Sequence, residues 1–268
     1  MSDHAFDAAV ALAPLQENVW QGQTSPAYAN MIGPFGGVTA AQALNAVLQH
    51  PQRLGEPLAL TVNFAAALAD GPFTLLARPA RTNRSTQHWI IEMRQGDAPV
   101  LTGTAVTGLR RSTWGTIEIA MPTVAHPGEV PVLPPRPREW FKRYELRFIE
   151  GGQPTVWDGS DHGHSRTRLW MRDNPPRALD FASLTALADV FTPGPWRRRA
   201  SFAPVSTVSM TVYFHADQAQ LQATGAGYLL GQGQAQAIHN GFYDMTAQLW
   251  NEAGQMLATT HQMVYYKE

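Results

Sequence analysis

The chain has 268 residues, 44% of them hydrophobic, which is ample apolar material for a sizeable core. Its 20 basic and 21 acidic residues give a formal net charge of -1, so it carries no electrostatic footprint for nucleic acid or for an anionic membrane. The sequence contains no cysteine, which excludes disulfides, a thiol nucleophile and a cysteine-ligated metal, and which fits a cytoplasmic protein.

The N-terminus holds a short apolar stretch, residues 8–15, that does not resemble a targeting signal. Asp3 and Asp7 precede it, where a signal peptide would carry Lys or Arg. No apolar run reaches the length needed to cross a bilayer. We therefore expect neither a leader peptide nor a membrane span.

The first half of the chain predicts one helix followed by four strands. The helix covers residues 36–45 and begins with the pair Gly36 and Gly37. The strands that follow are expected at 58–68, 73–81, 86–95 and 100–110. A segment rich in proline, between residues 122 and 137, then predicts an extended connector.

The second half repeats this order. After an aromatic-rich strand expected at Trp140, a helix is predicted at 180–189, and strands follow at 205–215, 228–237, 242–251 and 256–266. The two helices align without a gap, which places Asn45 opposite Asp189, and Phe64 of the first half falls opposite Phe214. Self-similarity on this scale indicates one module written twice.

The module itself is predicted to be α+β. Each helix is apolar nearly all the way round, which is typical of a buried helix, and the strands around it alternate in polarity. We therefore expect an antiparallel β-sheet wrapped around a long central α-helix, in a module at 1–110 and another at 140–268, with the linker at 111–139.

Several segments resemble the acyl-CoA thioesterase II family. The opening helix from Gly36 to Leu44, the helix aspartate Asp189, the strand that bears Thr207 and the last-strand glutamine Gln262 all match motifs of that family in order. The similarity runs from about Trp20 to Tyr266, whereas the linker and residues 217–227 look different, and the latter segment bears on the acyl pocket. The resemblance implies a double hotdog fold.

The resemblance also implies hydrolysis of an acyl-CoA thioester by a water held by Asp189, Thr207 and Gln262, with no covalent enzyme intermediate. The residue types suit this chemistry, because a carboxylate accepts a proton while a hydroxyl and a carboxamide both donate and accept. Burial would raise the pKa of Asp189. The N–H of Gly37, at the start of the first helix, would stabilise the developing oxyanion.

The alternation of its strand limits where Thr207 can lie. In its strand Val208, Met210, Val212 and Phe214 alternate onto one face, and Thr207 has the opposite parity. To meet Asp189, Thr207 must therefore lie at a strand end or after a bulge.

The first half lacks the corresponding polar residues. Opposite Asp189 stands Asn45, opposite Thr207 stands Pro57, and opposite Gln262 stands Val106, if the turn before the last strand is one residue longer in the second half. We therefore predict one active site per chain.

Each of these residues also has a purely structural interpretation. A lone buried aspartate is often satisfied by a neighbouring hydroxyl or N–H, threonine is common in strands, and a glutamine can cap a buried polar atom. A Gly-Gly pair can serve only the tight turn into a helix. It is the occurrence of all three polar residues together that favours the catalytic interpretation.

Other polar clusters are weaker candidates. Asp158, Asp161, His162 and His164 resemble a ligand set, but the glycines among them favour a solvated loop, so we predict no metal and no cofactor. The run from Trp196 to Arg199 suits phosphate binding but more often forms a charged loop.

Two further enzyme classes receive less support. His215 and His261 do not lie on or at the start of a helix, where hotdog dehydratases would be expected to place their histidine, and no Gly-x-Ser-x-Gly elbow is present. A non-catalytic acyl-binding double hotdog protein stays open as the alternative to an acyl-CoA thioesterase, with a dehydratase or hydratase third. The acyl group and a homo-oligomeric state are not determined by the sequence.

Overall fold

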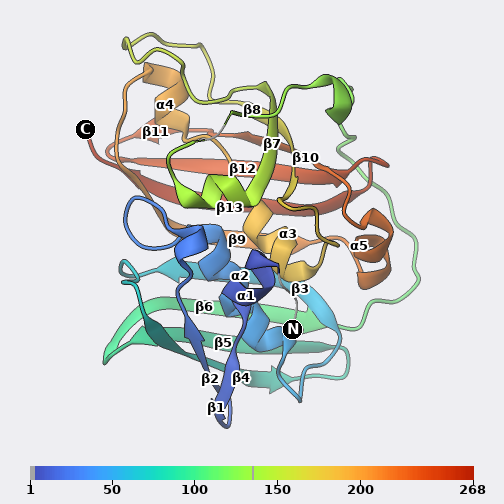
Figure 1. Cartoon of the computed structure of the whole chain (residues 1–268). Coiled ribbons are helices and arrows are strands. Elements are labelled where there is room, and N and C mark those ends of the chain that lie inside the picture. The colour runs from blue at the N-terminus through green and yellow to red at the C-terminus, as the bar shows by residue number, and fades with distance from the viewer. Residues whose placement is uncertain (1–3, 135) are drawn as a thin grey trace.

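The computed structural model describes residues 4–134 and 136–268, so that Asp3 and Pro135 lie outside it. Thirteen strands form one continuous sheet, and every strand pair in the described residues is antiparallel. Figure 1 shows the N-terminal half, in blue to green, below the C-terminal half, in yellow to red. Among the helices that are described, none is long and apolar enough to cross a membrane.

The N-terminal half supplies six strands in the order β1-β2-β4-β5-β6-β3. Its helices are α1 (Ala5–Val10), the 3-10 helix η1 (Pro26–Tyr28) and α2 (Gly36–Leu48). Its strands are β1 (Ala13–Gln16), β2 (Val19–Gln23), β3 (Glu56–Phe64), β4 (Pro72–Thr82), β5 (Thr86–Gln95) and β6 (Ala98–Gly108).

The C-terminal half continues the sheet in the order β9-β13-β12-β10-β8-β7, with β11 paired to β12. Its helices are η2 (Pro127–Glu129), η3 (Glu139–Arg143), α3 (Phe181–Leu187), α4 (Gly194–Arg199) and α5 (Gln218–Thr224). Its strands are β7 (Tyr144–Glu150), β8 (Thr167–Asp173), β9 (Val205–Phe214), β10 (Leu229–Gln234), β11 (Ile238–His239), β12 (Phe242–Asn251) and β13 (Met256–Tyr266).

The halves are joined by the ladder between β3 and β9, whose register is symmetric about one residue pair. Thr61 lies opposite Thr211, and the two hydroxyl oxygens are 3.0 Å apart. On either side Ala59 pairs with Tyr213 and Asn63 with Ser209. A local two-fold axis therefore passes between Thr61 and Thr211 and relates the two halves of the sheet.

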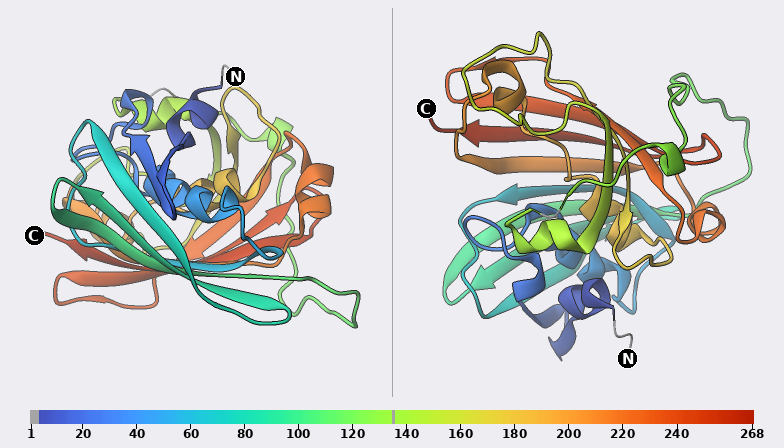
Figure 2. Two further views of the ribbon diagram at one scale, coloured as in Figure 1. Left: turned by 90° about the horizontal axis from the view of Figure 1, so that it is seen from below. Right: turned by 45° about the horizontal axis from the view of Figure 1, so that its top comes forward.

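The helices α2 and α3 pack against each other on the inner side of the curved sheet. Figure 2 shows this arrangement from below and from a tilted view. Most of α2 is buried, and all seven residues of α3 are, as their apolar sequences predict. The two helices thus carry residues from both halves into one interior.

The second helix is shorter than predicted. It ends at Leu187, not at residue 189, because its last N–H groups switch to closer acceptors: Asp189 N–H donates to Ala186 O and Val190 N–H to Leu187 O. Asp189 therefore lies in the turn that follows α3, outside the regular helix.

Two β-bulges change which side chains of β9 and β3 face the interior. In β9 the register with β13 skips Val208, and in β3 the register with β6 skips Leu58. The extra residue turns Val208 outward, where it is 39% exposed, so Val208 does not share a face with Met210 as its parity predicted. Thr207 faces the interior instead, which meets the condition set by its sequence position.

The matching bulges also fix which residue of β6 corresponds to Gln262. Thr207 pairs with Val264, and Pro57 pairs with Thr107. Counting back two residues along each strand from Val264 and Thr107 places Ala105, and not Val106, opposite Gln262. The alignment was wrong by one residue at this position, but the first half still has no carboxamide there.

Two other predicted features differ. Trp140 lies in η3 and not in a strand, and its ring stacks on Phe35 with centroids 4.3 Å apart. Residues 217–227 contain α5, and no residue of that segment lines the large cavity described below; Gln218 lines a separate, smaller pocket.

Candidate active site

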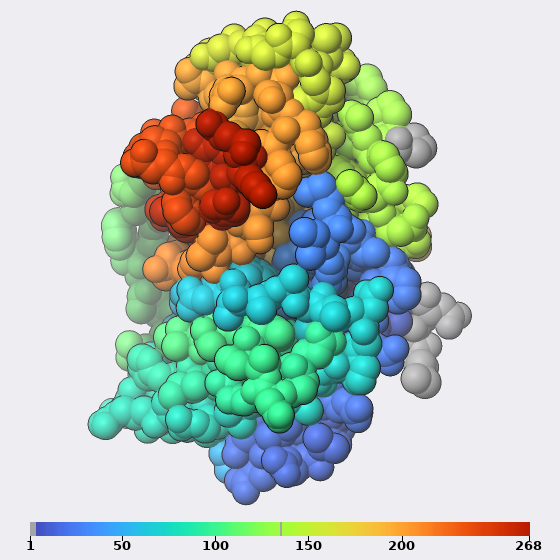
Figure 3. All heavy atoms as spheres, turned by 90° about the vertical axis from the view of Figure 1, so that its left-hand side faces the viewer, coloured from blue at the N-terminus to red at the C-terminus, as the bar shows by residue number. Residues whose placement is uncertain are grey.

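A cavity of about 930 Å³ lies between the two halves. Its walls come from the start of α2, the loop after β3, the segment around η3, the chain from Asp189 to Thr207, and the strands β12 and β13. Figure 3 shows one face of the molecule, where the blue segment that leads into α2 rests against the C-terminal half. Both halves are therefore needed to enclose the cavity.

The three predicted polar residues meet at this cavity from three separate elements. Asp189 follows α3, Thr207 lies near the start of β9 and Gln262 lies in the middle of β13. Gln262 is buried; its Nε2 lies 3.4 Å from Ala188 O and its side chain also donates to the carboxylate of Asp189. Asp189 and Thr207 are half-buried, and both line the cavity.

The N-terminus of α2 presses against Asp189 from the other half. Val38 and Thr39 donate their N–H groups to Phe35 O, which leaves those of Gly36 and Gly37 for acceptors outside the helix. The N–H of Gly37 donates to the carboxylate of Asp189. The predicted partner of this N–H was a substrate oxygen, and in the structure the partner is Asp189.

Both glycines are required by this close approach. A Cβ on Gly36 would lie 2.9 Å from Asp189 Oδ2, and a Cβ on Gly37 would lie 2.5 Å from Ala186 O. A side chain at Gly37 would require the backbone of α3 to move, and one at Gly36 would displace the carboxylate of Asp189. The Gly-Gly pair of the sequence thus allows one helix to begin against the end of the other.

The electrostatics of Asp189 suit a proton acceptor. Burial raises the pKa of its carboxyl from 3.8 to about 7, while the hydrogen bonds from Gln262 and Gly37 act in the opposite direction. A carboxyl with such a pKa is divided between its acid and its base near neutral pH. It is therefore a stronger base than an exposed aspartate, and this is the range in which general-base catalysis works best.

The remainder of the cavity wall is mostly apolar and aromatic. Phe35 and Trp140 stack on each other, and Trp196 contacts Trp157 and Phe202 edge-on or at a tilt. All five line the cavity. Such walls bury an apolar group and leave the polar corner around Asp189 for a reacting centre.

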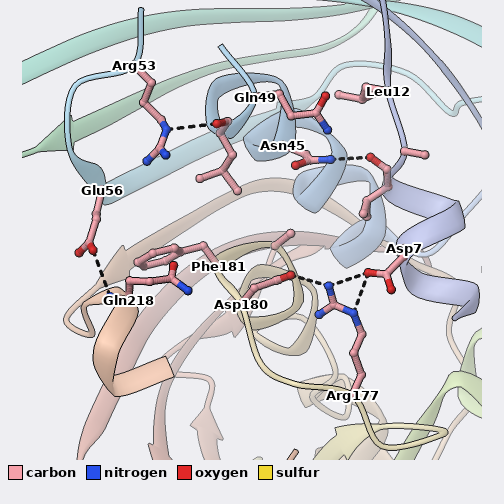
Figure 4. A pocket seen from close by; sticks show the side chains of 14 residues that line it. Asp7, Leu12, Asn45, Gln49, Arg53, Glu56, Arg177, Asp180, Phe181 and Gln218 are labelled. Carbon is pink, nitrogen blue, oxygen red and sulfur yellow. Dashed lines mark hydrogen bonds and ion pairs between the residues drawn. The ribbon is translucent and has the colours of Figure 1, made fainter. Parts of the chain in front are cut away.

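A smaller pocket of about 520 Å³ lies at the counterpart position of the first half. There Asn45 occupies the place of Asp189, and its Nδ2 donates to Val10 O of α1 at 2.7 Å (Figure 4). Arg177 reaches across and pairs with both Asp7 and Asp180. Asn45 and Arg177 thus have their partners within the protein: Asn45 binds α1, and Arg177 binds Asp7 and Asp180.

The weaker candidates of the sequence lie away from the reacting corner. Asp161 pairs with Arg198 at 2.8 Å, and Arg199 pairs with Glu268, so these charges meet on the surface. Asp158 accepts from the N–H of Ser160 in the same exposed loop. Within the described part of the chain no cluster of acidic residues and histidines is arranged to hold a metal ion.

Neither His215 nor His261 lines the cavity. His215 contacts Thr259 Oγ1 at 3.1 Å, and His261 contacts Asp244 at 3.3 Å. Among the described residues that line the large cavity there is no histidine.

Two family models match the chain, one in each half. Residues 25–108 match the acyl-CoA thioesterase N-terminal domain, and residues 120–266 match the acyl-CoA thioesterase C-terminal domain. The chain belongs to the acyl-CoA thioesterase II family. A comparison of this family member with curated proteins found no match.

Solved structures that resemble this acyl-CoA thioesterase II family member identify its fold. It is 44% identical to a conserved hot dog fold protein of unknown function from Alicyclobacillus acidocaldarius, over 100% of this chain and 99% of that one, with a TM-score of 0.93. A putative thioesterase II from Thermobifida fusca is 16% identical over 100% of both chains, with a TM-score of 0.83. The acyl-CoA thioesterase II TesB2 from Mycobacterium marinum is also 16% identical, over 98% of both chains, with a TM-score of 0.76. The fold is a hotdog fold.

The sequence analysis did not assign two residues that lie beside Asp189, Thr207 and Gln262. Gly36 lies against Asp189, since a Cβ on it would come within 2.9 Å of Asp189 Oδ2, and Tyr243 of β12 lines the cavity near Gln262. The Gly-Gly pair was a usable signal for Gly36. Nothing local distinguishes Tyr243 from the other aromatic residues of its strand, because its position depends on the register of three strands.

Proposed function

We propose that the protein hydrolyses acyl-CoA to a free carboxylic acid and coenzyme A. The observation that carries the proposal is the convergence of Asp189, Thr207 and Gln262, from three elements, on one enclosed cavity where burial has moved the pKa of the carboxyl to about 7. Membership of the acyl-CoA thioesterase II family supports the same reaction.

In the proposed reaction a water lies between the carboxylate of Asp189 and the thioester carbon. Thr207 and Gln262 orient the water, and its oxygen attacks the carbonyl carbon while Asp189 takes one of its protons. The tetrahedral intermediate then collapses, the C–S bond breaks, and the proton held by Asp189 passes to the sulfur. The products are the carboxylic acid and the coenzyme A thiol, and Asp189 returns to its starting state without a cofactor.

The N-terminus of α2 would stabilise the negative charge as it passes from Asp189 to the thioester oxygen. The negative charge leaves Asp189 when the carboxylate takes the proton, and it develops on the thioester oxygen. A helix N-terminus favours negative charge on either atom, since its N–H groups and dipole point outward. Gly37 thus holds Asp189 before the attack, and its N–H becomes available to the oxyanion as the carboxyl is neutralised.

We further propose that each half is a hotdog module with its own central helix, at 1–110 and 140–268, joined by the linker at 111–139. The two-fold register between β3 and β9 and the two separate family matches support this division. In the first half Asn45, which lines the smaller pocket, and Pro57 and Ala105, on β3 and β6, stand at the positions of the trio, which supports a single active site per chain.

The alternative functions differ from this one at the cavity. A dehydratase of the kind considered above uses histidine, and the histidines of the chain lie elsewhere than on the described cavity wall. A non-catalytic acyl-binding protein would use the apolar walls but would not need a carboxyl whose pKa is raised.

The test is release of thiol from a panel of acyl-CoA esters that differ in chain length, branching and aromaticity. The wild type should hydrolyse at least one class, and Asp189→Asn should lose on the order of 10² to 10⁴ in kcat, as expected for loss of a general base. Asp173→Asn is the matched control, because Asp173 is also a buried carboxyl but does not line the cavity. A wild type without thiol release, or an Asp189→Asn variant as active as the wild type, would refute the proposal.

A further inference from the structure

We propose that the hydroxyl of Tyr243 donates a hydrogen bond to the thioester carbonyl oxygen and to the oxyanion that forms from it. This role rests on the proposed hydrolysis, and it adds a catalytic residue that the sequence did not indicate. The strand register, the surroundings of the hydroxyl and the donors that the reaction still needs support this role.

The register places Tyr243 beside the trio. Across three adjacent strands Thr207 pairs with Val264, and Val264 pairs with Tyr243. One step along the same face Gln262 pairs with Met245. Tyr243 is therefore a diagonal neighbour of Gln262, and diagonal neighbours on one face lie about 7–8 Å apart, within reach of an aromatic side chain.

The ring of Tyr243 is held firmly while its hydroxyl is left without a protein partner. The residue is only 4% exposed; its ring pairs with Tyr266 at a centroid distance of 6.2 Å and packs beside Gly194. Across the described residues the hydroxyl makes no hydrogen bond, and Tyr243 lines the cavity. A buried tyrosine hydroxyl usually has a partner, so a hydroxyl that faces a cavity without one is placed to bind a ligand.

Other tyrosines do not share this arrangement. The hydroxyls of Tyr28 and Tyr144 also lack a partner, but they are fully enclosed by protein and their residues do not line the cavity. Among the described residues, Tyr243 is the tyrosine that lines the cavity.

The reaction still needs a donor in this position. Thr207 and Gln262 are assigned to the water, and the N–H of Gly37 is bound to Asp189 until the carboxylate takes a proton. A second, preorganised donor at the carbonyl oxygen would stabilise charge from the start of the attack. Burial, and next to it the charge of Asp189, raise the pKa of Tyr243 well above its usual value, so the hydroxyl keeps its proton and remains a donor.

The first experiment compares Tyr243→Phe with Tyr266→Phe. Both substitutions remove a hydroxyl from the same ring pair, but Tyr266 does not line the cavity. Tyr243→Phe should lower kcat on the order of 10²-fold with little change in KM, as is typical for loss of one oxyanion donor, and Tyr266→Phe should match the wild type. Equal kcat for Tyr243→Phe and the wild type would overturn the proposal.

A second measurement separates this proposal from the proposed function. A 2-oxoalkyl-CoA thioether keeps a ketone near the position of the thioester carbonyl and cannot be hydrolysed. Its isotope-edited infrared carbonyl band should shift to lower frequency on binding the wild type and Tyr266→Phe, and the shift should shrink in Tyr243→Phe. The shift supports Tyr243 as the donor even if no acyl-CoA is hydrolysed. An identical band in wild type and Tyr243→Phe, or no binding of the analogue, overturns it.

Discussion

Gly37 in the first half of the chain donates its backbone N–H to the carboxylate of Asp189 in the second half. The contact is possible because neither Gly36 nor Gly37 has a side chain to keep the two helices apart. The position of the proposed base therefore depends on residues about 150 positions away in the sequence, on the other side of the linker.

Gly36→Ala should reduce kcat without unfolding the protein. Its Cβ would lie 2.9 Å from Asp189 Oδ2, so the carboxylate must shift, and shifts of this kind cost on the order of 10² in rate. Gly115→Ala is the control, because a Cβ on Gly115 meets nothing within 4 Å. Circular dichroism should show the same fold for both variants, and a Gly36→Ala enzyme of normal kcat would contradict the placement of Asp189.

The pH dependence of kcat/KM should report the ionisation of Asp189. The base must be deprotonated to accept a proton, and its pKa is about 7. Activity should therefore rise with pH, with a limb centred near pH 7, and reach a plateau above it. A limb near the ordinary aspartate value of 3.8 would mean that Asp189 is not buried in solution or is not the base.

Asp189→Asn should make the folded protein more stable at neutral pH. Because the folded pKa of Asp189 is raised above its unfolded value of 3.8, the carboxyl favours folding most below pH 3.8, and this contribution is lost as pH rises through about 7. The amide carries no charge to desolvate. Thermal unfolding should show a higher Tm for Asp189→Asn than for wild type above pH 7, with the difference shrinking toward pH 3.8. A lower Tm for Asp189→Asn at every pH would contradict the cost assigned to burying the charged carboxylate.

Thr207→Val should lower kcat while Thr207→Ser retains most of it, because only the first removes the hydroxyl that orients the water. Loss of one such hydrogen bond costs about 1–3 kcal/mol, or roughly 5- to 150-fold in rate. Thr211→Val is the matched control: Thr211 lies on the same strand, but its hydroxyl contacts Thr61 at the junction of the halves and does not line the cavity. Equal losses in the Thr207 and Thr211 variants would point to strand packing and not to catalysis.

Much of the strand pattern was predictable because alternation and turn residues are local signals. The strands expected at 86–95, 242–251 and 256–266 have those bounds in the structure, and the start of α2 at Gly36 was also correct. The strands β1 and β2 were missed, since they are short and lie at the outer edge of the sheet.

The errors come from features that no local pattern fixes. The alignment of the last strands depends on the length of the turn before each of them, and the register with β3 and β9 puts Ala105, and not Val106, opposite Gln262. The end of α3 depends on which carbonyls its last N–H groups select. Trp140 looked like a strand residue because aromatic residues favour strands, but its stacking on Phe35 places it in a 3-10 helix.

The ladder through Thr61 and Thr211 has a consequence for how the two halves were free to change. In an assembly of two identical chains each substitution occurs twice, once on either side of the axis, so a residue that helps one site must be tolerated at the other. Here the axis lies within a single chain, and the positions of Asn45 and Asp189 belong to the same gene product but are encoded separately. In the proposed site one half holds the carboxylate through Gly37, while the other half supplies it as Asp189.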